Sequence, residues 1–286
     1  MKLASFLVEN RSCFGLVEEE LVYDLSALYS DIPDLKNFLE SLPDISDIKE
    51  KLAETAPYSL DDIQLLPVIP NPEKIICVGL NYESHRIETG MPEMKHPVLF
   101  TRFSSTQVAH GESIVRPHVS EKLDFEGELA VIIGQGGRHI RRENAYLHVA
   151  GYACYNDASI RDWQMHTGQF TPGKNFDSTG AFGPWMVTPD EIADLDSQTV
   201  TTRLNGEQVQ HAPFSDLIFD IPALIEYIST FCTLVAGDVI VTGTPGGVGV
   251  KRKPRLYMKR GDVIEVEISG VGVLKNSVVQ ESDSKR

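Results

Sequence analysis

Carboxylate side chains are concentrated where one apolar segment of the chain begins. Residues 122–134 read KLDFEGELAVIIG, with acids at Asp124, Glu126 and Glu128, every second position. On a β-strand, residues two apart lie on the same face, so we expect these three carboxylates to lie together. Like charges this close repel each other and raise each other's pKa, unless something positive is held between them.

A fourth acid, Asp157, follows a second apolar run in AGYACYNDASIRDWQ. At the end of a buried strand and before a helix, an acid is either a helix N-cap or a ligand. Three or so convergent carboxylates with no Cys or His nearby are typical of a site for a hard divalent cation, Mg²⁺, Mn²⁺ or Ca²⁺. The alternative is a solvated acidic strand face. The apolar continuation at residues 129–133 favours an interior site, and so does Gly127, which removes a side chain as if something packs closely there.

A histidine and a glutamate lie three residues apart in NYESHRIE, at His85 and Glu88. On a helical turn they would be neighbours. A carboxylate beside an imidazole fixes its tautomer and raises its basicity, so this pair could draw a proton from water. An isolated H-x-x-E pattern is at least as often a surface ion pair.

Two further segments carry polar groups among small residues. Lys174 in PGKN has small neighbours that would let its ammonium group approach an anionic oxygen, although a solvated loop lysine is the alternative. TGTPGGVGV is either a glycine-rich turn or a backbone that approaches a ligand closely. We favour the second interpretation, because Thr242 and Thr244 could point hydroxyl groups into a pocket.

The elements that must position these residues are mostly strands. Apolar, β-branched segments predict them at KIICVGL, PVLFTRF, ELAVIIG, AGYACYN, GPWMVT, VTTRL, DVIVTG, DVIEVEI and GVLKNSVV. Asn205-Gly206 after VTTRL is a strong hairpin signal. In this part of the chain, from residue 74 onward, helical spacing is confined to residues 82–89, 142–148, 159–165 and 221–230. Because strands and helices do not alternate regularly, the expected class is α+β, mostly β, with few helices.

The first quarter of the chain differs in composition from the rest. Residues 1–30 alternate like two or three short strands, and residues 34–56 have helical spacing. Residues 1–70 hold fourteen acidic against five basic residues, and the prolines of LLPVIPNP then indicate a boundary. The sequence predicts a small acidic α+β domain at residues 1–70 and a second domain at residues 71–286.

Composition excludes several classes of protein. With 42% hydrophobic and 23% charged residues the chain is typical of a soluble globular protein, and no apolar run reaches the roughly 20 residues of a membrane span. Charges at Glu9 and Arg11 come too early for a secretory signal, so we expect a cytoplasmic protein. The net charge of −15 disfavours nucleic acid and anionic membranes as partners. Four dispersed cysteines indicate free thiols.

Several segments resemble the fumarylacetoacetate hydrolase family, and they follow the family's order over about residues 74–280. They are KIICVGLNYESHRIE, PVLFTRFSS, LDFEGELAVIIG, GYACYNDASIRDWQ, GKNFDSTGAFGPW, LNGEQVQ and GDVIVTGTPGGVG. The first 70 residues match less distinctively. The resemblance implies a mixed β-roll or β-sandwich core that carries a divalent metal ion, usually Mg²⁺ or Mn²⁺, and it implies a homodimer.

The resemblance also implies roles for single residues. Glu126, Glu128 and Asp157 correspond to the metal ligands, with Asp124 held outside the ligand set. His85 and Glu88 correspond to a catalytic dyad on a mobile lid. Lys174 would lie beside the metal and stabilise enolate charge as it forms.

Four more residues are predicted to bind the substrate, namely Arg102, Arg161, Gln164 and Thr244. Arg161, Asp162 and Gln164 in SIRDWQ are expected to line or brace the pocket. Arg102 stands where many relatives carry lysine, which keeps the charge but changes its hydrogen-bonding geometry.

The implied function is hydrolysis of a C–C bond in a 2,4-dioxo acid, such as an acylpyruvate or fumarylpyruvate, through a metal-bound enolate. The same enolate would serve an oxaloacetate decarboxylase or a 2-hydroxy-dienedioate isomerase. In each case the partner is a small anionic 2-oxo acid. A different class is a non-catalytic binding protein stabilised by a structural cation. Lys174 and His85 argue against that class, because a structural site needs neither a lysine nor a dyad.

Overall fold

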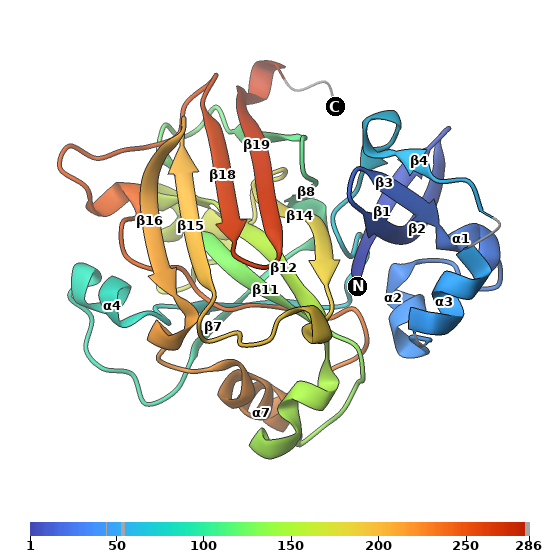
Figure 1. Ribbon diagram of the computed structural model, residues 1–286. Helices are drawn as coiled ribbons and strands as arrows, with labels where there is room; N and C mark the ends of the chain where they lie inside the picture. Colours follow the sequence, from blue (N-terminus) through green and yellow to red (C-terminus); the bar gives the residue numbers. More distant parts are fainter. Residues whose placement is uncertain (44, 53–54, 284–286) are drawn as a thin grey trace.

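Sheets dominate the computed structural model, which describes residues 1–43, 45–52 and 55–283 (Figure 1). The longest sheet runs in the order β4 (Tyr58–Ser59), β3 (Leu21–Asp24), β2 (Arg11–Glu18), β1 (Lys2–Val8), β14 (Gly180–Val187), β12 (Val149–Asp157), β11 (Gly127–Ile133), β17 (Val239–Val241), β6 (Ile75–Gly79) and β7 (Val98–Arg102). Strand β5 (Gln64–Leu65) pairs with β1, and β8 (Gln107–Val108) pairs with β14. Most neighbours are antiparallel, so the predicted class, α+β and mostly β, is confirmed.

A second sheet packs across the middle of the first, as the orange and red strands in Figure 1 show. Its order is β16 (Glu207–Pro213), β15 (Thr199–Leu204), β18 (Val263–Ile268), β19 (Gly272–Gln280) and β9 (Ser113–Arg116). The predicted hairpin at Asn205-Gly206 joins β15 to β16, with Leu204 opposite Glu207. A two-stranded sheet of β10 (Leu123–Asp124) and β13 (Ser159–Ile160) completes the arrangement.

Strand β11 is buried on both faces, which explains its continuous apolar sequence. Leu129, Val131 and Ile133 lie in the core between the two sheets, together with apolar residues of β18 and β19. Ala130 and Ile132 lie in the core on the opposite face, which includes apolar residues of helices α2 (Leu35–Glu40) and α3 (Ile45–Leu52). Strand β11, which follows Glu126 and contains Glu128, is therefore central to the fold.

What packs against Gly127 is the second sheet. A Cβ atom at this position would lie 2.0 Å from Thr202 Oγ1 and 3.3 Å from a Val266 methyl carbon, closer than side chains approach one another. Glycine is thus required where β11 passes beneath β15 and β18, between Glu126 and Glu128.

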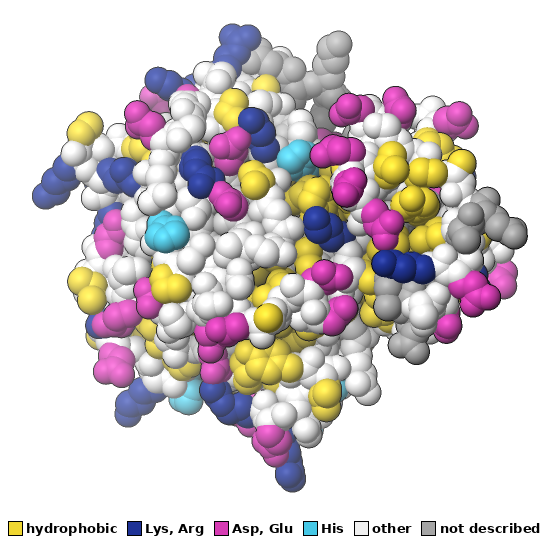
Figure 2. Space-filling model, in the orientation of Figure 1, with side chains coloured by type: hydrophobic (Ala, Val, Ile, Leu, Met, Phe, Trp, Pro, Cys, Tyr) yellow, Lys and Arg dark blue, Asp and Glu magenta, His cyan; other side chains and the backbone are white. Residues whose placement is uncertain are grey.

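The N-terminal unit contains the predicted strands and helices. Strand β1 pairs with β14 through Lys2–Val187 and Leu3–Met186, so the long sheet continues from this unit into the rest of the molecule. Residues 44 and 53–54 of the predicted helical stretch lie outside the described residues. Figure 2 shows acidic side chains spread over this unit, in keeping with its composition. The division at residue 70 stays a prediction.

The remaining helices are short and lie around the sheets. They are α1 (Leu25–Leu28), α4 (Glu83–Thr89), α5 (Arg161–Gln164), α6 (Thr171–Lys174) and α7 (Ile221–Phe231). The predicted helix at 142–148 is a 3-10 helix, and the predicted helix at 159–165 begins only at Arg161, because Ser159 and Ile160 pair with β10. Among the described residues, no helix is both long enough and apolar enough to cross a membrane.

Candidate metal centre

Strand pairing brings the three predicted metal ligands together. Strands β11 and β12 are antiparallel, with Glu128 opposite Tyr155. Just beyond that pair, the Asp157 backbone N–H donates to the Glu126 carbonyl oxygen at 2.9 Å. Glu126, Glu128 and Asp157 are all buried, and one carboxylate oxygen from each lies within 4.8 Å of the others. A contiguous triad of carboxylates therefore lies in the interior.

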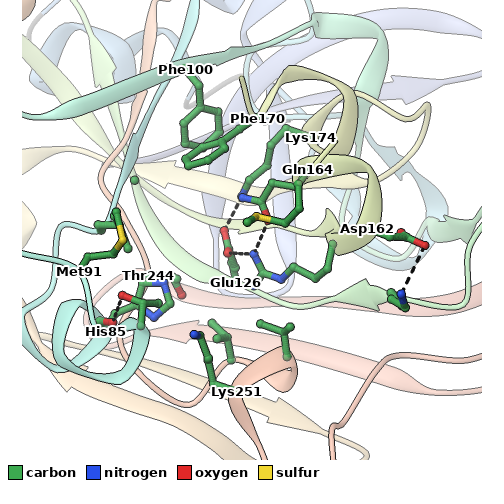
Figure 3. A pocket seen from close by; sticks show the side chains of 18 of the residues that line it. His85, Met91, Phe100, Glu126, Asp162, Gln164, Phe170, Lys174, Thr244 and Lys251 are labelled. Atoms are coloured by element: carbon green, nitrogen blue, oxygen red, sulfur yellow. Dashed lines mark hydrogen bonds and ion pairs between the residues drawn. The ribbon is translucent and has the colours of Figure 1, made fainter. Parts of the chain in front are cut away.

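Cationic side chains reach two of the three carboxylates. Lys174 Nζ contacts Glu126 Oε2, as Figure 3 shows. The same nitrogen lies 2.6 Å from Asp157 Oδ2. Arg161 contacts the other oxygen of Glu126 at 2.6 Å, and Arg102 contacts the other oxygen of Asp157 at 2.6 Å.

Glu128 is different from its two neighbours. Within the described part of the chain its carboxylate forms no ion pair, and it accepts a hydrogen bond from the Gly243 N–H at 2.6 Å. Glu128 is 2% exposed, so solvent does not compensate its charge either.

The pKa values follow these contacts. Burial alone would raise the pKa of Glu126, but the charges of Arg161 and Lys174 outweigh burial and lower that pKa to about 2. Burial raises the pKa of Glu128, and the negative charges of Asp157 and Glu126 raise it further, to well above its ordinary value. Burial would lower the pKa of Lys174, but Asp157 and Glu126 hold it above its ordinary value.

The residues fit a hard divalent cation. The donor set consists of carboxylate oxygens without Cys or His, which Mg²⁺ and Mn²⁺ prefer. Among the described residues, the neighbouring lysine and arginines pair with Glu126 and Asp157, but none of them forms an ion pair with Glu128. A cation bound here would supply the positive charge that Glu128 lacks.

Asp124 lies outside the triad. The chain leaves the extended pairing between β10 and β11, so the three alternating acids do not form one continuous strand face as the sequence predicted. The Asp124 carboxylate instead accepts hydrogen bonds from Arg161 Nε at 2.8 Å and from the N–H groups of Gly249 and Val250 at 2.8 and 2.9 Å. It thereby anchors both Arg161 and the glycine-rich loop.

Helix α4 brings the predicted dyad to the same region. His85 Nδ1 lies 3.1 Å from Glu88 Oε2, and His85 is 7% exposed. The other oxygen of Glu88 accepts the Gly247 N–H at 3.1 Å, and Ser84 accepts the Gly246 N–H at 3.2 Å. Burial would raise the pKa of Glu88, but the hydrogen bonds from His85 and Gly247 lower it below its ordinary value. The helix is thus fastened to the glycine-rich loop.

A cavity of about 510 Å³ connects these elements. Most of the predicted site residues line it, namely His85, Glu126, Glu128, Arg161, Gln164, Lys174 and Thr244. Gln164 accepts a hydrogen bond from Arg161 at 3.0 Å, and Thr244 donates to the Gly127 carbonyl at 3.0 Å. Glu88 and Asp157 do not line the cavity. Glu88 contacts the lining residue His85, and Asp157 contacts the lining residue Lys174.

Arg102 has a different place from the one expected of a substrate-binding residue. Its side chain is fully buried and does not line the cavity. Its guanidinium donates to Asp157 at 2.6 Å, to the Ala158 carbonyl at 3.1 Å and to Thr179 at 2.6 Å. Arg102 therefore orients a carboxylate of the triad instead of contacting a ligand in the cavity.

Sequence reasoning missed several residues that line the cavity, among them two aromatic and two basic side chains. Phe100 and Phe170 form an apolar wall with ring centroids 5.6 Å apart, and Lys174 Nζ lies 4.9 Å from the centre of the Phe100 ring. Nothing in the local pattern separated these rings from core residues. Lys251 and Arg255 are basic residues at the same cavity, and the charge run KRKPR was the signal that could have identified them.

Comparisons with known proteins show what the chain is similar to. The family model described as "Fumarylacetoacetate (FAA) hydrolase C-terminal" matches residues 74–279. The chain is similar to the mitochondrial oxaloacetate tautomerase fahd2 of Xenopus laevis, with 41% identity over 270 residues that cover 90% of this chain and 82% of the relative. It is also similar to the oxaloacetate tautomerase YisK of Bacillus subtilis strain 168, with 40% identity over an alignment of 303 positions that covers 97% of this chain and 100% of the relative.

Solved structures show the same fold. A fumarylacetoacetate hydrolase from Exiguobacterium antarcticum has a TM-score of 0.87 and 37% identity, over 98% of this chain and all of that chain. A maleylpyruvate hydrolase from Sphingobium sp. SYK-6, solved with manganese(II) and pyruvate, has a TM-score of 0.83 and 29% identity, over 98% of this chain and 99% of that chain.

Proposed function

Because this chain belongs to the fumarylacetoacetate hydrolase family, we propose that it catalyses metal-dependent keto–enol chemistry on a small 2-oxo acid, with tautomerisation of oxaloacetate as its principal reaction. The observation that carries the proposal is the buried carboxylate triad, two of whose members, Glu126 and Glu128, line the same cavity as Lys174 and His85. The relatives that act on oxaloacetate support the choice of substrate.

Glu126, Glu128 and Asp157 would hold the metal ion. When bound, Mg²⁺ or Mn²⁺ would supply Lewis-acid stabilisation of the negative charge that an enolate carries. Lys174 contributes a second, permanent positive charge at the same place, because its pKa is raised and it stays protonated. Its contacts with Glu126 and Asp157 also keep two carboxylates oriented before any ligand arrives.

His85 is the group placed to move a proton. Its Nδ1 faces Glu88, which leaves Nε2 as the ring nitrogen available for exchange with a ligand. In tautomerisation the proton is transferred between the enol oxygen and C3 of the acid, so one group that both accepts and donates suffices. Phe100 and Phe170 exclude water from one side of the cavity, which strengthens the electrostatic interactions within it.

Hydrolysis of a longer 2,4-dioxo acid is the second candidate. The cavity of about 510 Å³ lies in the range of roughly 300–1,000 Å³ that is typical of sites for larger ligands, and a four-carbon acid would not fill it. In this reaction His85 would remove a proton from the attacking water, with Glu88 stabilising the imidazolium.

Metal removal tests the proposal directly. Enol-oxaloacetate is followed by the loss of its ultraviolet absorbance, and acylpyruvates by the release of pyruvate, with CO₂ measured in parallel to detect decarboxylation. We expect acceleration with Mg²⁺ or Mn²⁺ above the rate of the metal alone, and none after full chelation. Activity that persists without any metal would refute the mechanism. Pyruvate release from acylpyruvates without tautomerisation would favour the second candidate.

Replacing the dyad residues should lower turnover without lowering metal affinity. We expect His85→Ala and Glu88→Gln each to decrease kcat about a hundredfold, because both remove proton transfer while leaving the carboxylate triad intact. The matched control is Glu83→Gln, which removes an exposed carboxylate paired with Arg86 on the same helix. Steady-state kinetics at saturating metal would measure the effect. Unchanged turnover in both dyad variants would show that His85 and Glu88 take no part in proton transfer.

A further inference from the structure

One short segment carries positive charge that is unusual for this chain. Residues 251–260, KRKPRLYMKR, contain six Lys and Arg and no acid, in a protein of net charge −15. The segment follows the glycine-rich loop directly. A charge run of this kind is usually a solvated surface, so its meaning depends on where each side chain lies.

Two of these cations lie at the cavity. Lys251 and Arg255 line it, whereas the intervening Lys253 does not. Within the described residues neither Lys251 nor Arg255 forms a salt bridge or a hydrogen bond through its side chain, and Lys251 is close enough to Glu88 to help lower its pKa. Figure 3 shows the Lys251 ammonium group extending into the cavity, on the side opposite Lys174.

The local structure fixes the position of this pair. The segment begins at the last residue of a single 3-10 turn, Gly249–Lys251. The N–H groups of Gly249 and Val250 in this turn donate to the Asp124 carboxylate at 2.8 and 2.9 Å. Arg252 donates to the Gly247 carbonyl at 2.9 Å, and the Leu256 N–H donates to the Gly249 carbonyl at 3.0 Å. Because Asp124 also holds Arg161, the basic segment and the metal centre share one buried anchor.

We propose that Lys251 and Arg255 bind the second carboxylate of a dicarboxylic 2-oxo acid and thereby determine the substrate class. This inference rests on the proposed function, in which a metal ion at the triad would stabilise the enolate formed at the 2-oxo end of the ligand. Lysine and arginine without other partners are well suited to receive the far carboxylate through charge-assisted hydrogen bonds. The reaction is then selective for dianions over monoanions of equal length.

A matched pair of ligands tests this selectivity without turnover. 2-Oxoglutarate and 2-oxopentanoate have the same chain length and differ only in a terminal carboxylate or methyl group. Their affinities for the Mn²⁺-loaded full chain would be measured by titration calorimetry at constant ionic strength. We expect 2-oxoglutarate to bind about tenfold more tightly, and we expect this preference to weaken at high salt.

Two variants distinguish direct recognition by Lys251 and Arg255 from attraction by the overall positive charge of the segment. The double variant Lys251→Gln/Arg255→Gln should lose the preference and leave binding of 2-oxopentanoate unchanged. Lys253→Gln removes a charge from the same segment but not from the cavity wall, so it should keep the preference.

Three outcomes would overturn the inference. If both ligands bind wild-type protein equally, the two cations do not recognise the second carboxylate, while the proposed function stands. If the preference persists in the double variant, or if Lys253→Gln abolishes it equally, the recognition lies elsewhere. If neither ligand binds, the proposed function and the inference both fail.

Discussion

Glu128→Gln is expected to abolish metal binding and lower turnover by a factor of about a thousand or more, because Lewis-acid stabilisation by the metal ion lowers the activation barrier by several kcal/mol. The same substitution should leave the metal-free protein at least as stable as the wild type. Ionised Glu128 is buried beside two like charges and forms no ion pair within the described residues. A neutral amide of the same shape removes that repulsion and can still accept the Gly243 N–H.

The measurement is the melting temperature with and without Mn²⁺. Wild-type protein should gain stability as the metal concentration rises above its dissociation constant, whereas the variant should show no shift. Glu121→Gln is the control, because Glu121 is an exposed acid in the segment leading to the same strand. A variant that still binds Mn²⁺ with wild-type affinity would remove Glu128 from the ligand set.

Lys174→Met should have the largest effect on stability. Lys174 is 1% exposed and lies between Glu126 and Asp157, so its loss leaves two buried carboxylates short of a partner. Removing one member of a buried ion pair costs about 3–5 kcal/mol. We expect a loss of this size in the metal-free protein and a smaller loss with Mn²⁺ present, because the metal ion replaces part of the missing charge.

Urea denaturation with and without Mn²⁺ would measure both values. The exposed Lys95→Met serves as the control, and it should change the free energy of unfolding by no more than about 0.5 kcal/mol. Turnover of Lys174→Met should remain at least a hundredfold lower at saturating metal, since the ammonium group also stabilises developing negative charge. An equal loss of stability with and without metal would argue against a cation at the triad.

Much of the sheet architecture could be predicted from local sequence. The apolar runs at KIICVGL and ELAVIIG form β6 and β11, and Asn205-Gly206 forms the hairpin between β15 and β16. These features depend on side-chain periodicity and turn chemistry, which are written in adjacent residues. The triad of Glu126, Glu128 and Asp157 was implied by the family resemblance, whereas the spacing of the acids left a solvated strand face as an alternative to a cation site.

Long-range contacts decided what local patterns could not. Asp124, Glu126 and Glu128 look equivalent in the sequence, but pairing of β10 with β13 separates Asp124 from the other two. Arg102 was predicted to bind the substrate from its place in the family pattern, whereas packing buries its side chain against Asp157. Lys251 and Arg255 resemble Lys253 in sequence, and only the path of the loop places two of the three at the cavity.

The position of the carboxylates on central strands gives the two sides of the site different freedom to move. Strands β11 and β12 are buried throughout, so loosening them amounts to opening the whole molecule. Helix α4 is fastened over the cavity by the N–H groups of Gly246 and Gly247, bonds that can break and re-form locally. We therefore expect ligands to enter and leave past helix α4 while the buried carboxylates on the central strands keep their positions.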